Sequence, residues 1–167
     1  MSYFSLNDNK FLNNEKIHVV KVFSIAPDAT VLAAITYMSE KNIGALPVMD
    51  GETLVGILSE RDYARKVLLM GRSSSDTLVR DIMTDKVITV TLNSSAKECI
   101  DLMTEKQLRH LPVVENDRVT GVVSIGDVVK LIIAEQTTKI NNLQAILNEV
   151  QSDKNLRNLL HRELDRI

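Results

Sequence analysis

The 167-residue chain has few of the residues that mark several protein classes. It contains one cysteine, no tryptophan, three prolines and three histidines. A single cysteine cannot form an internal disulfide, and histidines as far apart as His18, His110 and His161 make no metal-ligand set. No apolar run is long enough to cross a bilayer, and residues 1–14 lack the apolar stretch of a secretory signal. We therefore expect a cytoplasmic protein with no metal site and no membrane contact.

The rest of the composition is that of an ordinary globular protein. Hydrophobic residues make up 44% of the chain, charged residues make up 25%, and the formal net charge is −2. No stretch is strongly basic, which argues against nucleic acid as a partner. A chain of this length forms one compact domain or two small ones and can bury a real core.

The dominant feature is an internal repeat. When residues 22–68 are shifted forward by 65, they align with residues 87–133, and 11 of the 47 positions are identical. Each copy must then be one supersecondary unit, and two copies indicate a facing pair with a shared cleft. The identical residues of the first copy are Val22, Ile35, Met38, Glu40, Lys41, Leu46, Pro47, Val48, Gly56, Ser59 and Asp62.

Each copy begins with a short strand and an amphipathic helix. Residues 22–25 alternate as a strand, and Asp28 or Thr30 is placed to cap the helix that follows. In the second copy Ser94 or Ser95 has the capping position. Both helices carry an apolar stripe, formed by Val31, Ala34, Ile35 and Met38 in the first copy and by Ala96, Cys99, Ile100 and Met103 in the second.

Two strands and a second helix complete each copy. In the first copy a turn at Asp50-Gly51 joins strands at 45–49 and 53–58, and a helix follows over about 60–70. The second copy places these elements at 110–114, 118–123 and about 125–135. Pro47 favours an edge or terminal place in its strand, because proline has no N–H to donate.

The predicted fold class is α+β, with two β-α-β-β-α repeats related by pseudo-two-fold symmetry and a C-terminal helical extension. Gly71 and the three serines that follow Arg72 have the composition of an exposed linker. The expected domain organisation is an N-terminal segment 1–16, a first repeat 17–70, a linker 71–78, a second repeat 79–135 and a helical extension 136–167.

A Gly-apolar-x-Ser-x-x-Asp motif occurs at residues 56–62 and again at residues 121–127. Its serine and aspartate are Ser59 and Asp62 in the first copy and Ser124 and Asp127 in the second. At a strand-to-helix junction both side chains face one pocket, where a carboxylate can accept hydrogen bonds from the two hydroxyls of a ribose. The motif glycine would let a ligand approach the backbone. The alternative is a helix capping box, which needs no ligand; the double occurrence favours the ligand.

Together with Asp81-Ile82-Met83-Thr84 and the strand Arg109-His110-Leu111-Pro112-Val113-Val114, these motifs resemble the cystathionine beta-synthase (CBS) domain over residues 17–134. Two such domains in tandem form a disc-like Bateman module, here of the stand-alone signal-transduction type. The resemblance implies a regulatory sensor that binds AMP, ADP, ATP, NAD or S-adenosylmethionine in its cleft, with the motif serine and aspartate on the ribose. Catalytic members of the family carry a separate catalytic domain, for which this chain has no room. We therefore expect no enzymatic activity, no catalytic residues and no catalytic cofactor.

Differences between the copies supply the other candidate residues. Arg61, Arg109 and His110 are the phosphate candidates, since guanidinium groups bind phosphate well. The alternatives are solvated surface charge for the arginines, and a pH-sensing or strand-capping role for His110. By family analogy the adenine slot is formed by Lys21, Val22, Phe23, Ala45, Thr84, Lys86, Val87, Ile88 and Pro112, although such positions are more often core. In the alignment of the two copies Arg61 corresponds to Gly126 and Ala45 corresponds to His110, so the two ligand sites should be unequal.

The chain ends in a long helical pattern with apolar residues at near-heptad spacing. These residues are Ile133, Ile140, Leu143, Leu147 and Val150. Ser152 or Asp153 is placed to cap a further helical segment. Because an exposed apolar stripe is unfavourable, it must pack on the body or on a second chain, and we predict a homodimer contact. The competing function is therefore a ligand-independent interaction scaffold that acts through this tail on an unidentified protein.

Overall fold

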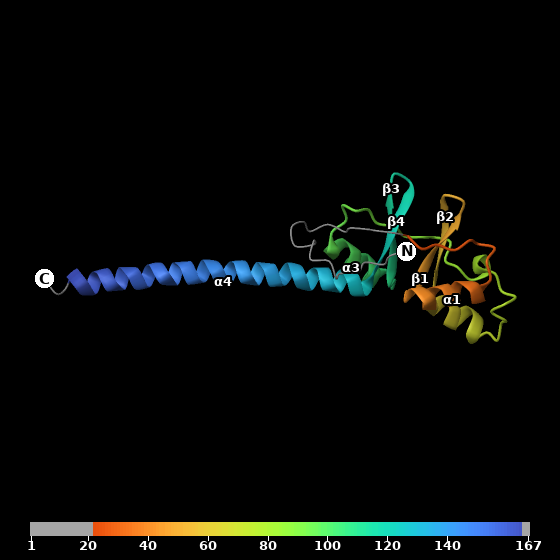
Figure 1. Ribbon diagram of the computed structural model, residues 1–167, viewed down its shortest axis with the longest axis horizontal. Coiled ribbons are helices and arrows are strands. Elements are labelled where there is room, and N and C mark those ends of the chain that lie inside the picture. Colours follow the sequence, from red (N-terminus) through yellow and green to blue (C-terminus); the bar gives the residue numbers. More distant parts are fainter. Residues whose placement is uncertain (1–21, 165–167) are drawn as a thin grey trace. The chain divides into compact units, whose positions relative to one another are not determined.

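The structure is a computed structural model that describes residues 22–164, and their side chains as far as Lys154. The chain divides into two compact units, Met1–Val129 and Lys130–Ile167. The first unit contains two β-hairpins with their accompanying helices (Figure 1). The described part of the second unit is a single stretch of helix.

In the first repeat a hairpin stands between two helical segments. The elements are α1 (Val31–Lys41), β1 (Ala45–Asp50), β2 (Thr53–Ser59), α2 (Glu60–Tyr63) and a π-helical turn (Ala64–Leu68) that continues α2. Residues 22–25, expected to form a strand, pair only at Ile25, which lies parallel to Val48. The helix expected over 60–70 is present, but it changes to π geometry at Ala64 and ends at Leu68.

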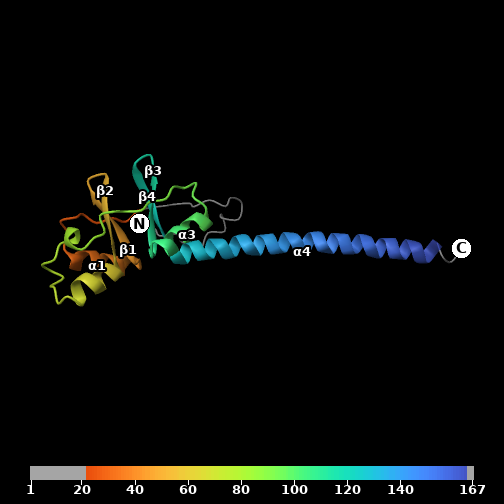
Figure 2. The ribbon, with the colours of Figure 1, turned by 180° about the vertical axis from the view of Figure 1, so that it is seen from behind.

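The second repeat reproduces the first. Its elements are a 3-10 turn (Val79–Asp81), α3 (Ala96–Glu105), β3 (His110–Glu115), β4 (Arg118–Ser124) and α4 (Ile125–Leu164). Val90 forms one parallel bridge, to Val113, just as Ile25 does in the first repeat, and both hairpins have an irregular register at the equivalent position. Strands β2 and β4 are in contact, and the hairpins stand side by side with their turns at the same end (Figure 2). The predicted α+β class with two repeats is confirmed.

Proline is accommodated inside the hairpin because of how the strands pair. Pro47 lies opposite Ile57, whose N–H and C=O are both bonded to Thr84 at 2.9 Å. Residue 47 therefore needs no N–H to bond its β2 partner. Its carbonyl accepts a hydrogen bond from the N–H of Ile25 at 3.0 Å.

The helix caps resolve the choices that the sequence left open. Thr30, rather than Asp28, caps α1, since its hydroxyl accepts a hydrogen bond from the third helical N–H at 3.2 Å. Ser95, rather than Ser94, caps α3 and forms a capping box with Glu98. Both boundaries follow the known preference for Ser and Thr at the N-cap.

The linker is more ordered than its composition indicated. The carbonyls of Ser74 and Thr77 accept hydrogen bonds from the N–H groups of Leu32 and Val31, both at 2.9 Å. They satisfy two of the four N–H groups that a helix start leaves without partners. Thr77 is only 9% exposed. The linker therefore caps α1 instead of crossing the surface freely.

The segment that leads into the second repeat packs on the first repeat. Val79 and Ile82 are almost fully buried in the core of the first repeat. Two residues on, Thr84 forms an antiparallel bridge with Ile57 of β2. The core that receives them consists of Val31, Ala34, Met38, Ile43, Leu46, Val48, Leu58 and Val67.

Helix α4 continues without a break through Ser152 and Asp153 to Leu164. The prediction of a new helical segment at those two residues is wrong, because Ser and Asp at a possible cap do not end a helix that has no other stop signal. The near-heptad residues Ile133, Ile140, Leu143, Leu147 and Val150 are between 49% and 65% exposed. Among the described residues no helix is long and apolar enough to cross a membrane.

Candidate functional site

A cavity of about 460 Å³ opens beside the motif of the first repeat. We call it the first-motif cavity. It is bounded by the end of β2, by α2, by Thr84 and by residues 107–110 at the start of β3, so both repeats contribute to it. The lining residues are Gly44, Ile57, Ser59, Glu60, Arg61, Asp62, Arg65, Thr84, Gln107, Leu108, Arg109 and His110.

The serine and aspartate of each motif are bonded to each other. Ser59 donates to Asp62 Oδ2 from its hydroxyl at 2.6 Å and from its N–H at 3.1 Å, and the Asp62 N–H donates back to Ser59 Oγ at 3.3 Å. Ser124 and Asp127 make the same three bonds at 2.6, 3.0 and 3.3 Å. Both motifs are thus capping boxes. A carboxylate has about four acceptor positions, so the second oxygen, Oδ1, stays outside the box.

The two motif aspartates differ in what else surrounds them. Asp62 Oδ1 is paired with Lys66 Nζ at 2.8 Å. The same ammonium donates to the carbonyl of Ile82 at 2.6 Å, which ties the π-helical turn after α2 to the segment that carries Thr84. Asp127 is only 7% exposed; it acts on the neighbouring His110, whose charged form it favours, and it forms no ion pair with a described lysine or arginine.

A hydrogen bond across the repeats lies in the wall of the cavity. Arg61 Nη1, from the first repeat, donates to the backbone carbonyl of Gln107, from the second, at 3.0 Å. Gln107 has φ +55°, a left-handed conformation that glutamine rarely adopts. Its equivalent in the first repeat, Asn42, has φ +54°, so this is the left-handed turn that ends the helix in both repeats.

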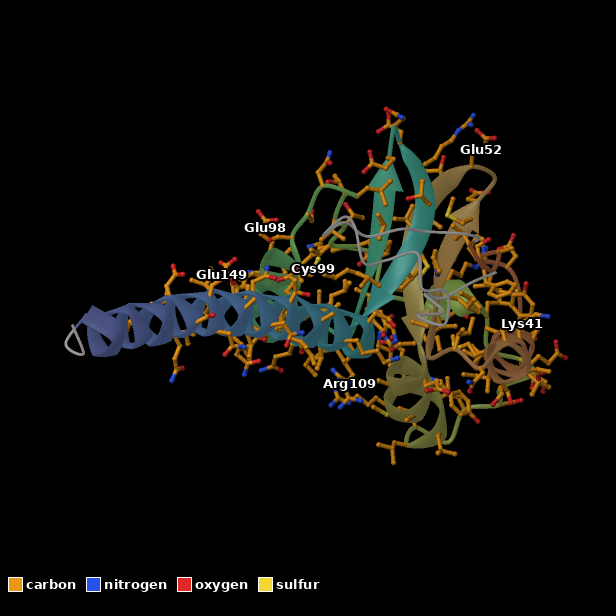
Figure 3. All side chains as sticks on the ribbon, turned by 60° about the vertical axis from the view of Figure 1, so that its left-hand side comes forward. Lys41, Glu52, Glu98, Cys99, Arg109 and Glu149 are labelled. Atoms are coloured by element: carbon orange, nitrogen blue, oxygen red, sulfur yellow. The ribbon has the colours of Figure 1, made fainter. Side chains whose placement is uncertain are left out.

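Two further arginines line the cavity and are exposed. Arg65 follows Arg61 by one helical turn, and Arg109 precedes β3. Neither forms an ion pair within residues 22–154. Figure 3 shows Arg109 beside the helix that begins at Glu60. Unpaired guanidinium groups from both repeats can therefore bind one anionic group.

His110 lies deeper in the same wall. Burial lowers the pKa of its imidazole from 6.5 to about 4; Asp127 opposes the shift, and Arg109 and Arg61 add to it. The imidazole is therefore neutral at physiological pH and can bind phosphate only as a neutral donor. A side chain at Gly44 would approach the ring, since an added Cβ would lie 3.4 Å from His110 Nε2 and 3.3 Å from Glu60 Oε2. The absence of a side chain at Gly44 keeps this part of the cavity open.

The residues expected to form the adenine slot are dispersed. Thr84 lines the first-motif cavity, whereas Val22 lines a second cavity of about 280 Å³ at the hairpin turns. Phe23 packs edge-on against Tyr37, with 5.4 Å between the ring centroids. Ala45 and Pro112 are buried within strands, Lys86 is exposed, and Val87 and Ile88 are half-buried. Lys21 lies outside the described residues.

The motif glycine of the first repeat serves packing. A Cβ added at Gly56 would collide with the Met83 side chain, lying 2.9 Å from its Cγ, and would lie 3.2 Å from the carbonyl oxygen of Thr84. The close approach is thus made by the segment that leads into the second repeat. The expectation that Gly56 gives a ligand room to reach the backbone is wrong for this copy.

Sequence reasoning missed several residues that line the cavity. Glu60, Arg65, Gln107 and Leu108 were not among the candidates, although all four lie in it. Arg65 could have been found from its four-residue spacing from Arg61, which places both on one helix face. No sequence signal marks Gln107, because it takes part through its backbone carbonyl, a group that every residue has.

The metal-binding and thiol chemistry of the described residues lies outside this cavity or is missing. Within residues 22–154 no cluster of three or more His, Cys, Asp or Glu side chains could hold a metal ion. Cys99 is buried outside the cavity, and burial raises the pKa of its thiol. What the cavity offers is hydrogen-bonding groups and positive charge.

Known proteins show the same architecture. A family model of the CBS domain matches residues 15–69 and 79–134. The chain is 42% identical over 125 residues to the mitochondrial CBS domain-containing protein CBSX3 of Arabidopsis thaliana, a match that covers 72% of this chain and 61% of that protein. Only that part of the plant protein is therefore comparable.

Solved structures agree with this match. A putative signal-transduction protein with CBS domains from Burkholderia ambifaria is 49% identical, with a TM-score of 0.67 over 70% of this chain and 85% of its own. The CBS-domain pair of protein MJ0100, in complex with 5′-methylthioadenosine and S-adenosylmethionine, is 27% identical, with a TM-score of 0.62 over 70% and 93%. Since the two family matches span more than half of the chain, this protein belongs to the CBS-domain family and is a tandem CBS pair of the regulatory type.

Proposed function

We propose that the chain is a regulatory module that binds an adenine nucleotide, of the AMP, ADP, ATP or NAD class, in the first-motif cavity. The observation that carries the proposal is the meeting, in one cavity, of the Ser59–Asp62 pair with arginines from both repeats. The Ser59–Asp62 pair supplies the hydrogen-bond acceptors and donors that a ribose needs, and the arginines supply the guanidinium groups that bind a phosphate. We assign no enzymatic activity to the chain.

The residues divide into three roles, one for each part of the nucleotide. Ser59 and Lys66 fill all but about one of the acceptor positions of Asp62, and the remaining position accepts a hydrogen bond from a ribose hydroxyl. Arg61, Arg109 and His110 bind the phosphate, the histidine as a neutral donor. Thr84 and Ile57 also line the cavity, and the adenine would lie against them.

Binding would be signalled through the contact between the repeats. The Arg61–Gln107 hydrogen bond joins them, and a phosphate in the cavity competes for the same guanidinium. A ligand shifts an equilibrium only by its differential affinity for two arrangements. Exchange of a backbone carbonyl for a phosphate at Arg61 is a source of such a difference, and rearrangement of a homodimer would pass it on.

A thermal-shift series with AMP, ATP, NAD and S-adenosylmethionine tests the proposal. A nucleotide present at 100 times its Kd should stabilise the protein by about 2.7 kcal/mol. The Asp62→Ala variant should lose this shift. Its matched control is Glu98→Ala, which also removes the acid of a capping box, in α3, but lies outside the cavity. No shift of the wild type with any nucleotide would contradict the proposal.

The exposed stripe of α4 supports a second candidate, a ligand-independent scaffold. Its five near-heptad residues are each about half exposed or more in the single chain. We propose that this stripe pairs with a second copy or an unidentified protein, in the cytoplasm. Light scattering of the full chain and of a chain ending at residue 135 tests this proposal. The full chain should be a dimer, and the shortened chain, which lacks most of the stripe, should dimerise more weakly. A monomeric full chain would contradict self-association.

A further inference from the structure

The two repeats differ in the charged residues that lie around the serine–aspartate motif. Arg61, Lys66 and Arg109 are basic and lie in this cavity or against its aspartate. The equivalents of Arg61 and Lys66 in the second repeat are Gly126 and Leu131. The equivalent of Arg109 is Gly44, which lines the same cavity, so this pair does not distinguish the two motifs. Only Arg65 has a basic equivalent, Lys130.

The ribose motifs themselves do not differ. The three hydrogen bonds of the Ser59–Asp62 box agree within 0.1 Å with those of the Ser124–Asp127 box. Helix capping therefore accounts equally well for both motifs. What separates them is the charge around the carboxylate.

That charge decides how each motif can interact with an anion. The negative charge of Asp62 is offset by Lys66, and Arg61, Arg65 and Arg109 add positive charge in a chain whose formal net charge is −2. Asp127 is buried beside His110, whose imidazole is neutral, and forms no ion pair with a described lysine or arginine. A phosphate placed next to a carboxylate that no cation offsets is repelled, whereas one among guanidinium groups is held.

We propose that the chain binds one phosphorylated adenosine ligand, in the first-motif cavity, and that the Ser124–Asp127 motif acts as a helix cap that receives none. This inference rests on the proposed function and adds which motif is used and how many ligands bind. Arg65, which the sequence did not single out, is then a residue that selects the phosphate.

Calorimetric titration of the full chain with AMP and ATP measures the stoichiometry. We expect one ligand per chain, and binding that weakens as the salt concentration rises, since the phosphate contacts are exposed. Adenosine and 5′-methylthioadenosine, which lack the phosphate, should bind at least about tenfold more weakly.

A matched pair of variants, Arg65→Gln and Lys130→Gln, tests the assignment to one motif. Both side chains are exposed and occupy equivalent positions in the repeat, so neither change should affect folding. Arg65→Gln should weaken AMP binding about tenfold, whereas Lys130→Gln should change it less than about twofold.

The outcomes separate the two levels of the proposal. If no adenosine ligand binds the wild type, the proposed function is wrong and this inference fails with it. If AMP binds with two equivalents per chain, or if Lys130→Gln weakens binding as much as Arg65→Gln, the proposed function stands and the one-site inference is wrong. Equal affinity for AMP and adenosine would also overturn the role of Arg65.

Discussion

Acidification should destabilise the protein through a single buried imidazole. Burial holds the pKa of His110 at about 4, against an ordinary value of 6.5, so the folded state keeps this ring neutral. Between these two values the unfolded chain binds a proton that the folded chain does not. Stability therefore rises with pH in this window, is fully present above about pH 6.5, and is lost as the pH falls towards about 4.

The magnitude follows from the two pKa values. Between about pH 7.5 and about pH 5, the linkage relation gives a loss of about 2 kcal/mol in the free energy of unfolding from His110 alone. A loss of this size is a large part of the stability of a small domain. Asp127 favours the charged ring, and Arg61 and Arg109 disfavour it.

Urea unfolding of the wild type and of His110→Gln at both pH values measures this term. Glutamine is neutral throughout, so the variant should lack the loss assigned to His110 while keeping any contribution of the carboxyl groups. Saturation with AMP should reduce the loss in the wild type, because a nearby phosphate raises the pKa of the imidazole. An equal pH dependence in the wild type and the variant would refute the reasoning.

Three further predictions concern packing and reactivity. Gly56→Ala should destabilise the protein by about 1–3 kcal/mol, because the added Cβ would clash with Met83. Gly126→Ala should be neutral or stabilise α4 by up to about 1 kcal/mol, since the nearest atom to an added Cβ there is 3.6 Å away. Urea titrations of the two variants check this difference. Lys66→Met should destabilise by about 1 kcal/mol and weaken AMP binding in calorimetry; unchanged affinity would argue against its role in positioning the carboxylate. Cys99, fully buried and with a raised pKa, should react with iodoacetamide only in denaturant; fast labelling of the native protein would contradict this.

Much of the fold could be predicted because the repeat and the hydrophobic periodicity agree with each other. The apolar stripe that contains Val31 and Met38 is buried as its spacing requires, and so is the stripe with Cys99 and Met103. The predicted length of the initial strand in each repeat was too great, because alternation over four residues does not show how many of those residues pair with a neighbouring strand. Only Ile25 does.

The site was predictable only in part, because residues far apart in sequence form it. The motif located Ser59 and Asp62, and mismatches between the repeats pointed to Arg61 and Arg109, all of which line one cavity. That Thr84 joins them depends on its bridge to β2. Tertiary pairing of this kind leaves no local pattern.

The crossing of residues 79–84 onto the first repeat has a consequence for how the protein can be divided. A polypeptide cut at the boundary of the sequence repeat would leave the first half without Val79 and Ile82, two nearly fully buried members of its own core. Large-to-small losses in a core are costly, and the loss of whole residues is more so. Independent folding of the first half requires a fragment that extends to Thr84. Recombination between such genes would likewise preserve both folds only if the exchange lay beyond that residue.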